Sequence, residues 1–288
     1  ITPYYGHVGT SIPTRISITE GISFNEVTET VEYAFDNEEQ IEIYRLLVDY
    51  YKKGFIAPDA LVRTEVVQEI KTGNYGVFND PGGYTEDGSK SSGMYGFKCY
   101  ETLFAYPLIQ TNSLLGAGNA ISATSPNPER AMMVLDLFWA DRYLSNTMAY
   151  GVEGKNYEVI SGDIHDPAVD SVVEAKSGDE QTWAIWHNWV GPLWDQWSSN
   201  WNTTEALQKM QDDNQNSEAS KLLGFLFDPE PVKQEIAQLN AIWTEAGPIL
   251  GSGSVPDLDK YLEELRQRMD NADGQKVIQE VERQIEEW

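Results

Sequence analysis

Short apolar strands alternate with capped helices along the first half of the chain, and this alternation limits the folds open to it. Asn37 can cap a helix whose apolar residues at 41–51 recur on one face. A strand at 75–78 ends in a turn-rich loop, and a strand at 119–122 leads to a helix start with Pro128 at its first position. Strand–loop–helix alternation of this kind predicts an α/β fold.

Further elements follow from the same patterns. We expect strands at 94–97 and 102–109, and a helix after Pro128 that buries a stripe of Met132, Leu135 and Trp139. The end of the chain predicts three amphipathic helices, at about 229–243, 258–269 and 275–288.

The charge balance excludes several classes of partner. The chain has 46 acidic and 20 basic residues, a formal net charge of −26. Nucleic-acid binding depends on Lys and Arg that neutralise phosphates, so we expect no nucleic-acid partner. The same balance disfavours docking on an anionic membrane surface, and no stretch has the roughly 18 apolar residues needed to span a bilayer.

Metal and cofactor motifs are absent from the sequence. Cys99 is the single cysteine, which excludes a disulfide framework and a Cys-cluster zinc site. The three histidines form no HExxH pattern, and the Asp212-x-Asn214-x-Asn216 run lacks the glycine and the glutamate of a calcium loop. No GxSxG or phosphate-binding loop occurs, so we expect no cofactor.

A dense group of aromatic residues is the strongest functional signal. Six of the nine tryptophans fall between 183 and 201, at spacings that would place most of them on one side if the stretch were helical. A packed core stripe is one interpretation. The other is a sugar site, because indole faces stack on the apolar side of a pyranose while nearby amides and carboxylates bind its hydroxyls.

The loop at 79–84 is a second candidate. It places Asn79, Asp80 and Tyr84 after a strand, and ligands of open α/β sheets bind at the carboxyl ends of strands. A plain surface turn explains the local sequence equally well.

Several separated segments resemble the extracellular solute-binding proteins, family 1, of carbohydrate ABC transporters. Residues 118–132 are similar to the strand and helix shared with maltose-binding-type proteins. Residues 150–157 resemble the YGxEGxxY segment of LipO-like members, and 224–240 resemble their GFxFD element. The terminus at 280–288 is close to that of a DUF3502-type domain, with Glu282 where Gln is more common.

The resemblance covers roughly residues 36 to 288 and implies a two-lobed, type II periplasmic-binding-protein fold, in part. Such proteins are usually longer, so we expect this chain to be part of one, holding most of the carboxyl-terminal lobe. Residues 1–93 would begin that lobe, 94–145 would pass into the amino-terminal lobe, and 146–288 would complete the carboxyl-terminal lobe with a helical end.

The resemblance also implies which residues line the ligand cleft. They are the three residues of the 79–84 loop named above and a second group from the tryptophan-rich stretch, namely Trp183, Trp186, His187, Asn188 and Trp189. Related sequences often have Gly-Asn in place of His187-Asn188, a departure that favours a larger or more apolar-faced saccharide.

The function implied is capture of an oligosaccharide and its delivery to ABC permease subunits, without catalysis. The protein would be a monomer at the extracellular face of the membrane, anchored by a lipidated cysteine upstream of this chain. A glycoside hydrolase or an accessory carbohydrate-binding domain is the alternative, and an interaction domain without a small ligand is a third.

Overall fold

The computed structural model describes most of the chain. The described backbone comprises residues 2–5, 15–63, 66–78, 85–102, 108–112, 118–176, 182–183, 185, 187–200 and 202–288. The side chains of 2–5, 66–68 and 188 are not described.

The chain divides into two units, each built from separate stretches of sequence. The first comprises Ile1–Pro81, Phe104–Thr111 and Ser217–Trp288, and the second comprises Gly82–Leu103 and Asn112–Asn216. Each unit mixes helices and strands, so the predicted α/β class is confirmed. The predicted lobe boundaries stay a prediction.

The first unit combines small sheets with long helices. Its strands are β1 (Thr2–Tyr5), β2 (Arg15–Thr19), β3 (Ile22–Asn25), β4 (Thr30–Tyr33), β5 (Tyr75–Phe78), β6 (Leu108–Ile109) and β10 (Glu218–Ala219). Its helices are α1 (Glu38–Lys52), η1 (Ala60–Val62), α2 (Val66–Lys71), η5 (Glu230–Val232), α8 (Lys233–Ser252), α9 (Leu258–Asn271) and α10 (Gly274–Glu287). β2, β3 and β4 form an antiparallel sheet, whereas β1–β5 and β6–β10 are parallel pairs.

Helix α1 forms where the sequence predicts it. The Asn37 side chain accepts a hydrogen bond from the Gln40 backbone N–H, which satisfies one of the free donors at the helix start. Tyr44, Leu47 and Val48 recur at helical spacing and are buried. The predicted cap and apolar face are therefore confirmed.

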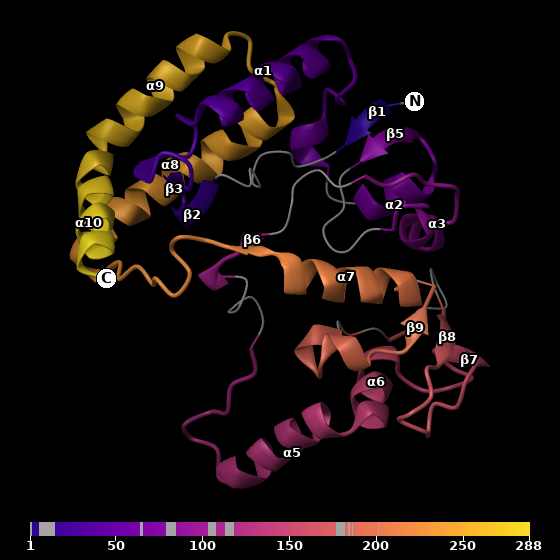
Figure 1. The fold of residues 1–288 in the computed structure, drawn as a ribbon. Coiled ribbons are helices and arrows are strands. Elements are labelled where there is room, and N and C mark those ends of the chain that lie inside the picture. The colour runs from indigo at the N-terminus through magenta and orange to yellow at the C-terminus, as the bar shows by residue number, and fades with distance from the viewer. Residues whose placement is uncertain are drawn as a thin grey trace. The chain divides into compact units, whose positions relative to one another are not determined.

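The three predicted carboxyl-terminal helices are also present, as α8, α9 and α10. Leu239, Leu265 and Val281, one from each helix, are at most 1% exposed in the core of the first unit. Figure 1 shows these helices together with α1 and the β2–β3 sheet. The burial of these side chains together with those of α1 and the β2–β4 sheet stabilises this unit.

The second unit has shorter elements. They are α3 (Ser89–Tyr95), α5 (Pro128–Ala140), α6 (Arg142–Tyr150), β7 (Tyr157–Ser161), β8 (Val172–Ala175), η3 (His187–Trp189), η4 (Leu193–Asp195), β9 (Ser198–Ser199) and α7 (Thr204–Asn216). β7 and β8 are antiparallel, and β9 joins β8 in parallel. The rejected calcium-loop run lies in α7.

Two sequence predictions for this unit are wrong. Residues 94–97 are not a strand, because 94 and 95 end helix α3 and Gly96 terminates it in the left-handed conformation. Residues 119–122 form no strand either. Of the predicted strand at 102–109, only β6 is described, and residues 103–107 lie outside the described part.

Helix α5 starts at Pro128 as predicted, but its predicted buried stripe is wrong. Met132 is 58% exposed and Trp139 is 62% exposed, and Leu135 is only partly buried. No residue of α5 is buried by the described part of the chain. The periodicity identified the helix correctly, but nothing described here covers its apolar side.

The core of the second unit is small and aromatic. Trp197 is 1% exposed and stacks on Tyr150 with ring centroids 6.1 Å apart and planes 9° apart. Tyr157 lies 5.7 Å from Trp197, and Val173 of β8 is buried in the same cluster. Trp197 is thus a core residue and does not belong to a ligand surface.

Among the described helices, none combines the length and apolar character that crossing a bilayer requires.

Candidate functional site

The tryptophan segment, defined here as residues 183–197, is not an α-helix. Its described part contains two single-turn 3₁₀ helices, η3 and η4, separated by Gly191 and Pro192. Pro192 has no N–H to donate, and proline disfavours a helical conformation at the residue before it. The described tryptophans of the segment therefore do not share one helical face, although their spacing in the sequence would allow it.

Backbone contacts hold the first half of the segment on the end of α6. The Trp183 indole N–H donates to the Met148 carbonyl at 2.9 Å, and the Ile185 N–H donates to the Ala149 carbonyl at 3.1 Å. The indole N–H of Trp183 is thus satisfied within the protein. Trp183 as a whole residue is 45% exposed, so part of its surface is available for apolar contact.

At Gly191 the segment lies close to residues of α5 and α6. A Cβ at this position would lie 2.7 Å from the Ser145 Cβ and 2.8 Å from the Phe138 carbonyl oxygen. Real Cβ atoms do not tolerate such distances to backbone, so a glycine is needed here. This approach keeps the segment close to α6 between η3 and η4.

Three tryptophans of the segment are open to solvent. Trp183, Trp189 and Trp194 are 45%, 54% and 43% exposed, respectively. The Trp189 carbonyl accepts a hydrogen bond from the Asn119 side chain at 3.0 Å, which fixes the backbone that carries this indole. Exposed indoles on a fixed backbone are suited to stacking on a flat apolar ligand face.

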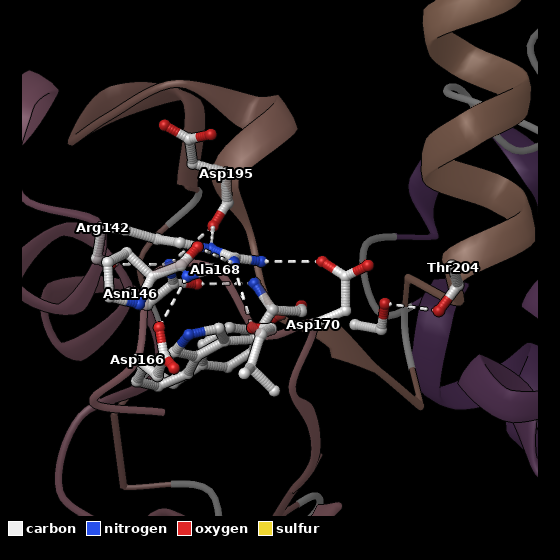
Figure 2. Close-up of polar contacts among 12 residues, drawn as sticks. Arg142, Asn146, Asp166, Ala168, Asp170, Asp195 and Thr204 are labelled. Carbon is white, nitrogen blue, oxygen red and sulfur yellow. Dashed lines mark hydrogen bonds and ion pairs between the residues drawn. The ribbon is translucent and has the colours of Figure 1, made fainter. Parts of the chain in front are cut away.

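Arg142, at the start of α6, binds the second half of the segment (Figure 2). Its Nε donates to the Asp195 carbonyl at 2.9 Å, and its Nη1 donates to the carbonyls of Pro167 and Val169 at 3.0 and 3.1 Å. Its Nη2 lies 3.5 Å from an Asp170 carboxylate oxygen. The guanidinium of Arg142 thus connects three parts of the unit, namely α6, η4 and the loop that precedes β8.

Asn146, one turn further along α6, completes these contacts. Its Nδ2 donates to the carbonyls of Arg142 and Asp195, both at 2.8 Å, and its Oδ1 accepts from the Trp197 N–H at 2.8 Å. The Asn146 side chain is fully buried. All its polar atoms bind backbone, so it determines the path of residues 195–197.

His187 is placed beneath the surface. The side chain is 4% exposed, and neither ring nitrogen has a hydrogen-bond partner among the described residues. Burial, together with the positive charge of Arg142, lowers the pKa of His187 to about 4, so the ring is neutral near pH 7. As placed, the ring is not open to a ligand, and its predicted contact with saccharide stays a prediction.

The other predicted site residues lie outside the described part of the structure. This applies to Asn79, Asp80, Tyr84 and Trp186, and to the side chain of Asn188. The structure therefore brings Trp183, His187 and Trp189 onto one segment. It does not relate that segment to the 79–84 loop.

The described residues contain no group of three or more His, Cys, Asp or Glu side chains that could hold a metal ion. Cys99 is buried, and its burial raises the pKa of the thiol. The exposed groups on the described part of the tryptophan segment include indole rings and the Asp195 side chain.

Sequence reasoning missed Arg142 and Asn146. The sequence pattern that could have identified them is a charged and an amide side chain four residues apart at the start of a helix. Residues at this spacing lie on the same helix face. That signal is weak, because the partners are main-chain carbonyls far along the sequence. Trp194, exposed beside these contacts, was noted in the sequence but not chosen as a site residue.

Comparison with known proteins gives the wider context. Residues 221–288 match the family described as a domain of unknown function, DUF3502. Over 252 residues the chain is 24% identical to a carbohydrate ABC transporter substrate-binding protein of Streptococcus pneumoniae serotype 4, covering 86% of this chain and 49% of that protein. The chain thus spans about half the length of the curated relative it matches.

Solved structures of the N-glycan transport solute-binding protein NgtS from Streptococcus pneumoniae are similar over the whole chain. The NgtS crystal structure superimposes with a TM-score of 0.82 at 22% identity, with 100% of this chain and 63% of that chain covered. The complex of NgtS with Man5GlcNAc superimposes with a TM-score of 0.78 at 21% identity, and 63% of that chain is covered. The complex with Man1GlcNAc superimposes with a TM-score of 0.80 at 21% identity, and 64% of that chain is covered. The chain therefore has part of the α/β solute-binding-protein fold, and the predicted resemblance to the carboxyl-terminal portion of a solute-binding protein is confirmed.

Proposed function

We propose that the chain is part of a carbohydrate-binding component of an ABC transporter, which captures an oligosaccharide and does not cleave it. The observation that carries this proposal is the tryptophan segment. Three of its indoles are exposed on a backbone fixed to α6, within a fold whose relatives are named as carbohydrate transport proteins. The crystal complexes of NgtS with Man5GlcNAc and Man1GlcNAc support an oligosaccharide as the ligand class.

The proposed contacts are aromatic stacking and hydrogen bonds. Trp183 and Trp189 would stack on the apolar faces of the sugar rings, and Trp186, His187 and Asn188 would complete this side of the site. Asn79, Asp80 and Tyr84 would bind from the strand-end loop. Closure of two lobes around the ligand would shift the population toward a closed form, as in other two-lobed binding proteins.

The cellular setting follows from the same proposal. The ligand would pass to ABC permease subunits, and the protein would act as a monomer held at the extracellular face of the membrane by a lipid anchor. The strongly acidic chain suits uncharged saccharides, since a net charge of −26 repels uronates unless the site is locally basic.

The test is a titration of the purified chain with neutral oligosaccharides, including Man5GlcNAc, followed by intrinsic tryptophan emission and by an assay for new reducing ends. We expect a saturable change in emission and no new reducing ends. New reducing ends would support a glycoside hydrolase instead. A flat response across a broad glycan panel would contradict both and favour an interaction domain.

Substitution of Trp189 sharpens this test. Trp189→Ala is expected to weaken oligosaccharide binding by roughly 1–3 kcal/mol, because an exposed stacking aromatic is lost. Trp288→Ala is the matched control, since Trp288 is 60% exposed but lies in the first unit. An unfolded Trp189→Ala variant, or one with unchanged affinity, would contradict the assignment of this indole to the ligand surface.

We further propose that residues 94–145 belong to the amino-terminal lobe of the complete fold. Helix α5 supports this, because Met133 and Trp139 are 66% and 62% exposed on a helix with no buried residue. A helix that is apolar around most of its surface is normally covered. The covering part would be the third of the solute-binding fold that this chain does not span.

Met133→Glu tests this lobe assignment. In a protein that carries the remainder of the fold, the change should cost roughly 1–3 kcal/mol, since a carboxylate would be buried. In the 288-residue chain it should cost less than about 0.5 kcal/mol, as expected for an exposed position. Equal effects in urea unfolding of the two proteins would contradict the assignment.

A further inference from the structure

The hydrogen bonds that Arg142 and Asn146 make with the tryptophan segment go to its backbone at Asp195 and Trp197, and neither residue lies among the predicted sugar contacts. We propose that they are positioning residues that hold this part of the segment in the form that presents Trp194 to a saccharide. This inference rests on the proposed function and adds residues to its binding site.

The first argument is the geometry of Arg142. Its guanidinium donates to three main-chain carbonyls at 2.9–3.1 Å, and among the described residues it forms an ion pair with Asp170 at 3.5 Å (Figure 2). The Asp170 carboxyl is 89% exposed, so the ion pair with it contributes little. The Arg142 side chain itself is only 16% exposed. Its contacts therefore serve the backbone path and are not primarily a surface ion pair.

The second argument is that Arg142 and Asn146 bind the residue directly after Trp194, whereas Tyr150 binds the segment further along, at Gln196 and Trp197. Residues 190–197 contain only the single turn η4 and no α-helix or strand, and Trp194 is 43% exposed. Asn146 and Arg142 both bind the Asp195 carbonyl, and Asn146 also binds the Trp197 N–H. Arg142 and Asn146 thus both hold the backbone of the residue that follows the exposed Trp194.

The third argument is the position of His187 at the other end of η3 and η4. Its ring is buried without a hydrogen-bond partner among the described residues, and the charge of Arg142 disfavours its protonation. Among the described residues, the His187 ring therefore adds no hydrogen bond to those that Arg142 and Asn146 make with the segment. A preorganised backbone spares the ligand the cost of ordering the indoles when it binds.

The test compares Arg142→Gln with Arg130→Gln, an exposed arginine of α5. Both changes remove one positive charge. Arg142→Gln is expected to weaken oligosaccharide binding by about tenfold or more, because the stretch that carries the Trp194 indole must then be ordered by the ligand. Arg130→Gln is expected to stay within about twofold of the parent chain, as for other surface changes.

Hydrogen exchange separates positioning from general destabilisation. In Arg142→Gln, amides of residues 187–197 should exchange faster, while those of β7 should be unchanged. Leu239→Ala, in the core of the first unit, is a structural control that should lower stability without changing affinity. If Arg142→Gln does not fold, Arg142→Lys keeps the charge but cannot reach all three carbonyls, and the same result is expected in weaker form.

A folded Arg142 variant that binds within about twofold of the parent, or whose segment exchanges at the parent rate, would overturn the proposal. If the parent chain binds no oligosaccharide, the proposed function fails on its own. The exchange measurement then still decides whether Arg142 orders the segment.

Discussion

The two units of this chain are stabilised in different ways. The first has a large aliphatic core made by α1, α8, α9 and α10 against the β2–β4 sheet. The second has a small aromatic core around Trp197 and depends on side chains such as Arg142 and Asn146, which bind main-chain groups. A large core fixes its unit through apolar area, whereas a small core leaves room for irregular segments that can carry a ligand surface.

The largest expected effect is in the second unit. Trp197→Ala should cost roughly 3–5 kcal/mol, because it removes the ring that packs on Tyr150 and Tyr157 and leaves a cavity. Urea unfolding followed by hydrogen exchange should show the loss in β7 and β8. Trp189→Ala, at a 54% exposed position, is the control and should change stability little. An equal loss of stability in the two variants would contradict the assignment of Trp197 to the core and Trp189 to the surface.

The corresponding change in the first unit is Leu239→Ala. Leu239 is fully buried, and its truncation should cost roughly 2–5 kcal/mol. Leu226→Ala is the matched control, because Leu226 is 65% exposed. If the two units are independently stabilised, exchange in β7 and β8 stays at the parent rate. Faster exchange there would show that the units unfold together.

The stability of the second unit should depend on pH through the buried side chain of His187. His187 has a pKa of about 4 in the folded chain and 6.5 as the ordinary value, so the folded state binds its proton less readily than the unfolded state. The contribution of the neutral ring is therefore fully present above about pH 6.5, and up to roughly 3 kcal/mol of stability is lost as the pH falls from about 6.5 to about 4.

His187→Leu removes this titration and keeps an apolar side chain. Its free energy of unfolding should fall less than that of the parent between about pH 6.5 and about pH 4. The difference between the two proteins is the quantity to measure, because carboxylates protonate in both. Parallel curves would contradict the burial of a neutral His187.

The smallest expected effect compares one helix cap from each unit. Asn37 caps α1 and Asp141 caps α6, each through a side-chain oxygen that accepts a backbone N–H. Asn37→Ala and Asp141→Ala should each cost about 1 kcal/mol in thermal or urea unfolding. A much larger loss for Asp141→Ala would indicate that the start of α6 limits the stability of the second unit through Arg142.

Sequence patterns predicted the first unit well and the second unit poorly. The helices α1, α8, α9 and α10 have long amphipathic periods, which are set locally. The strand predicted at 94–97 failed because Gly88 and Gly96 bound a short helix that composition alone does not reveal.

The candidate site was predicted only in part. The density of tryptophans identified the segment, but not which indoles are buried. Trp197 is a core residue because α6 brings Tyr150 to it, and this depends on contacts between residues far apart in sequence. The same holds for Arg142, whose partners are carbonyls 25 to 53 residues away.

The most direct test of the account is a calorimetric titration of the purified chain with a neutral oligosaccharide such as Man5GlcNAc, repeated with Trp189→Ala. The account predicts saturable heat from the parent chain, a clearly weaker signal from the variant and an unaltered sugar recovered afterwards. Identical isotherms for the two proteins, or a cleaved sugar, would contradict it.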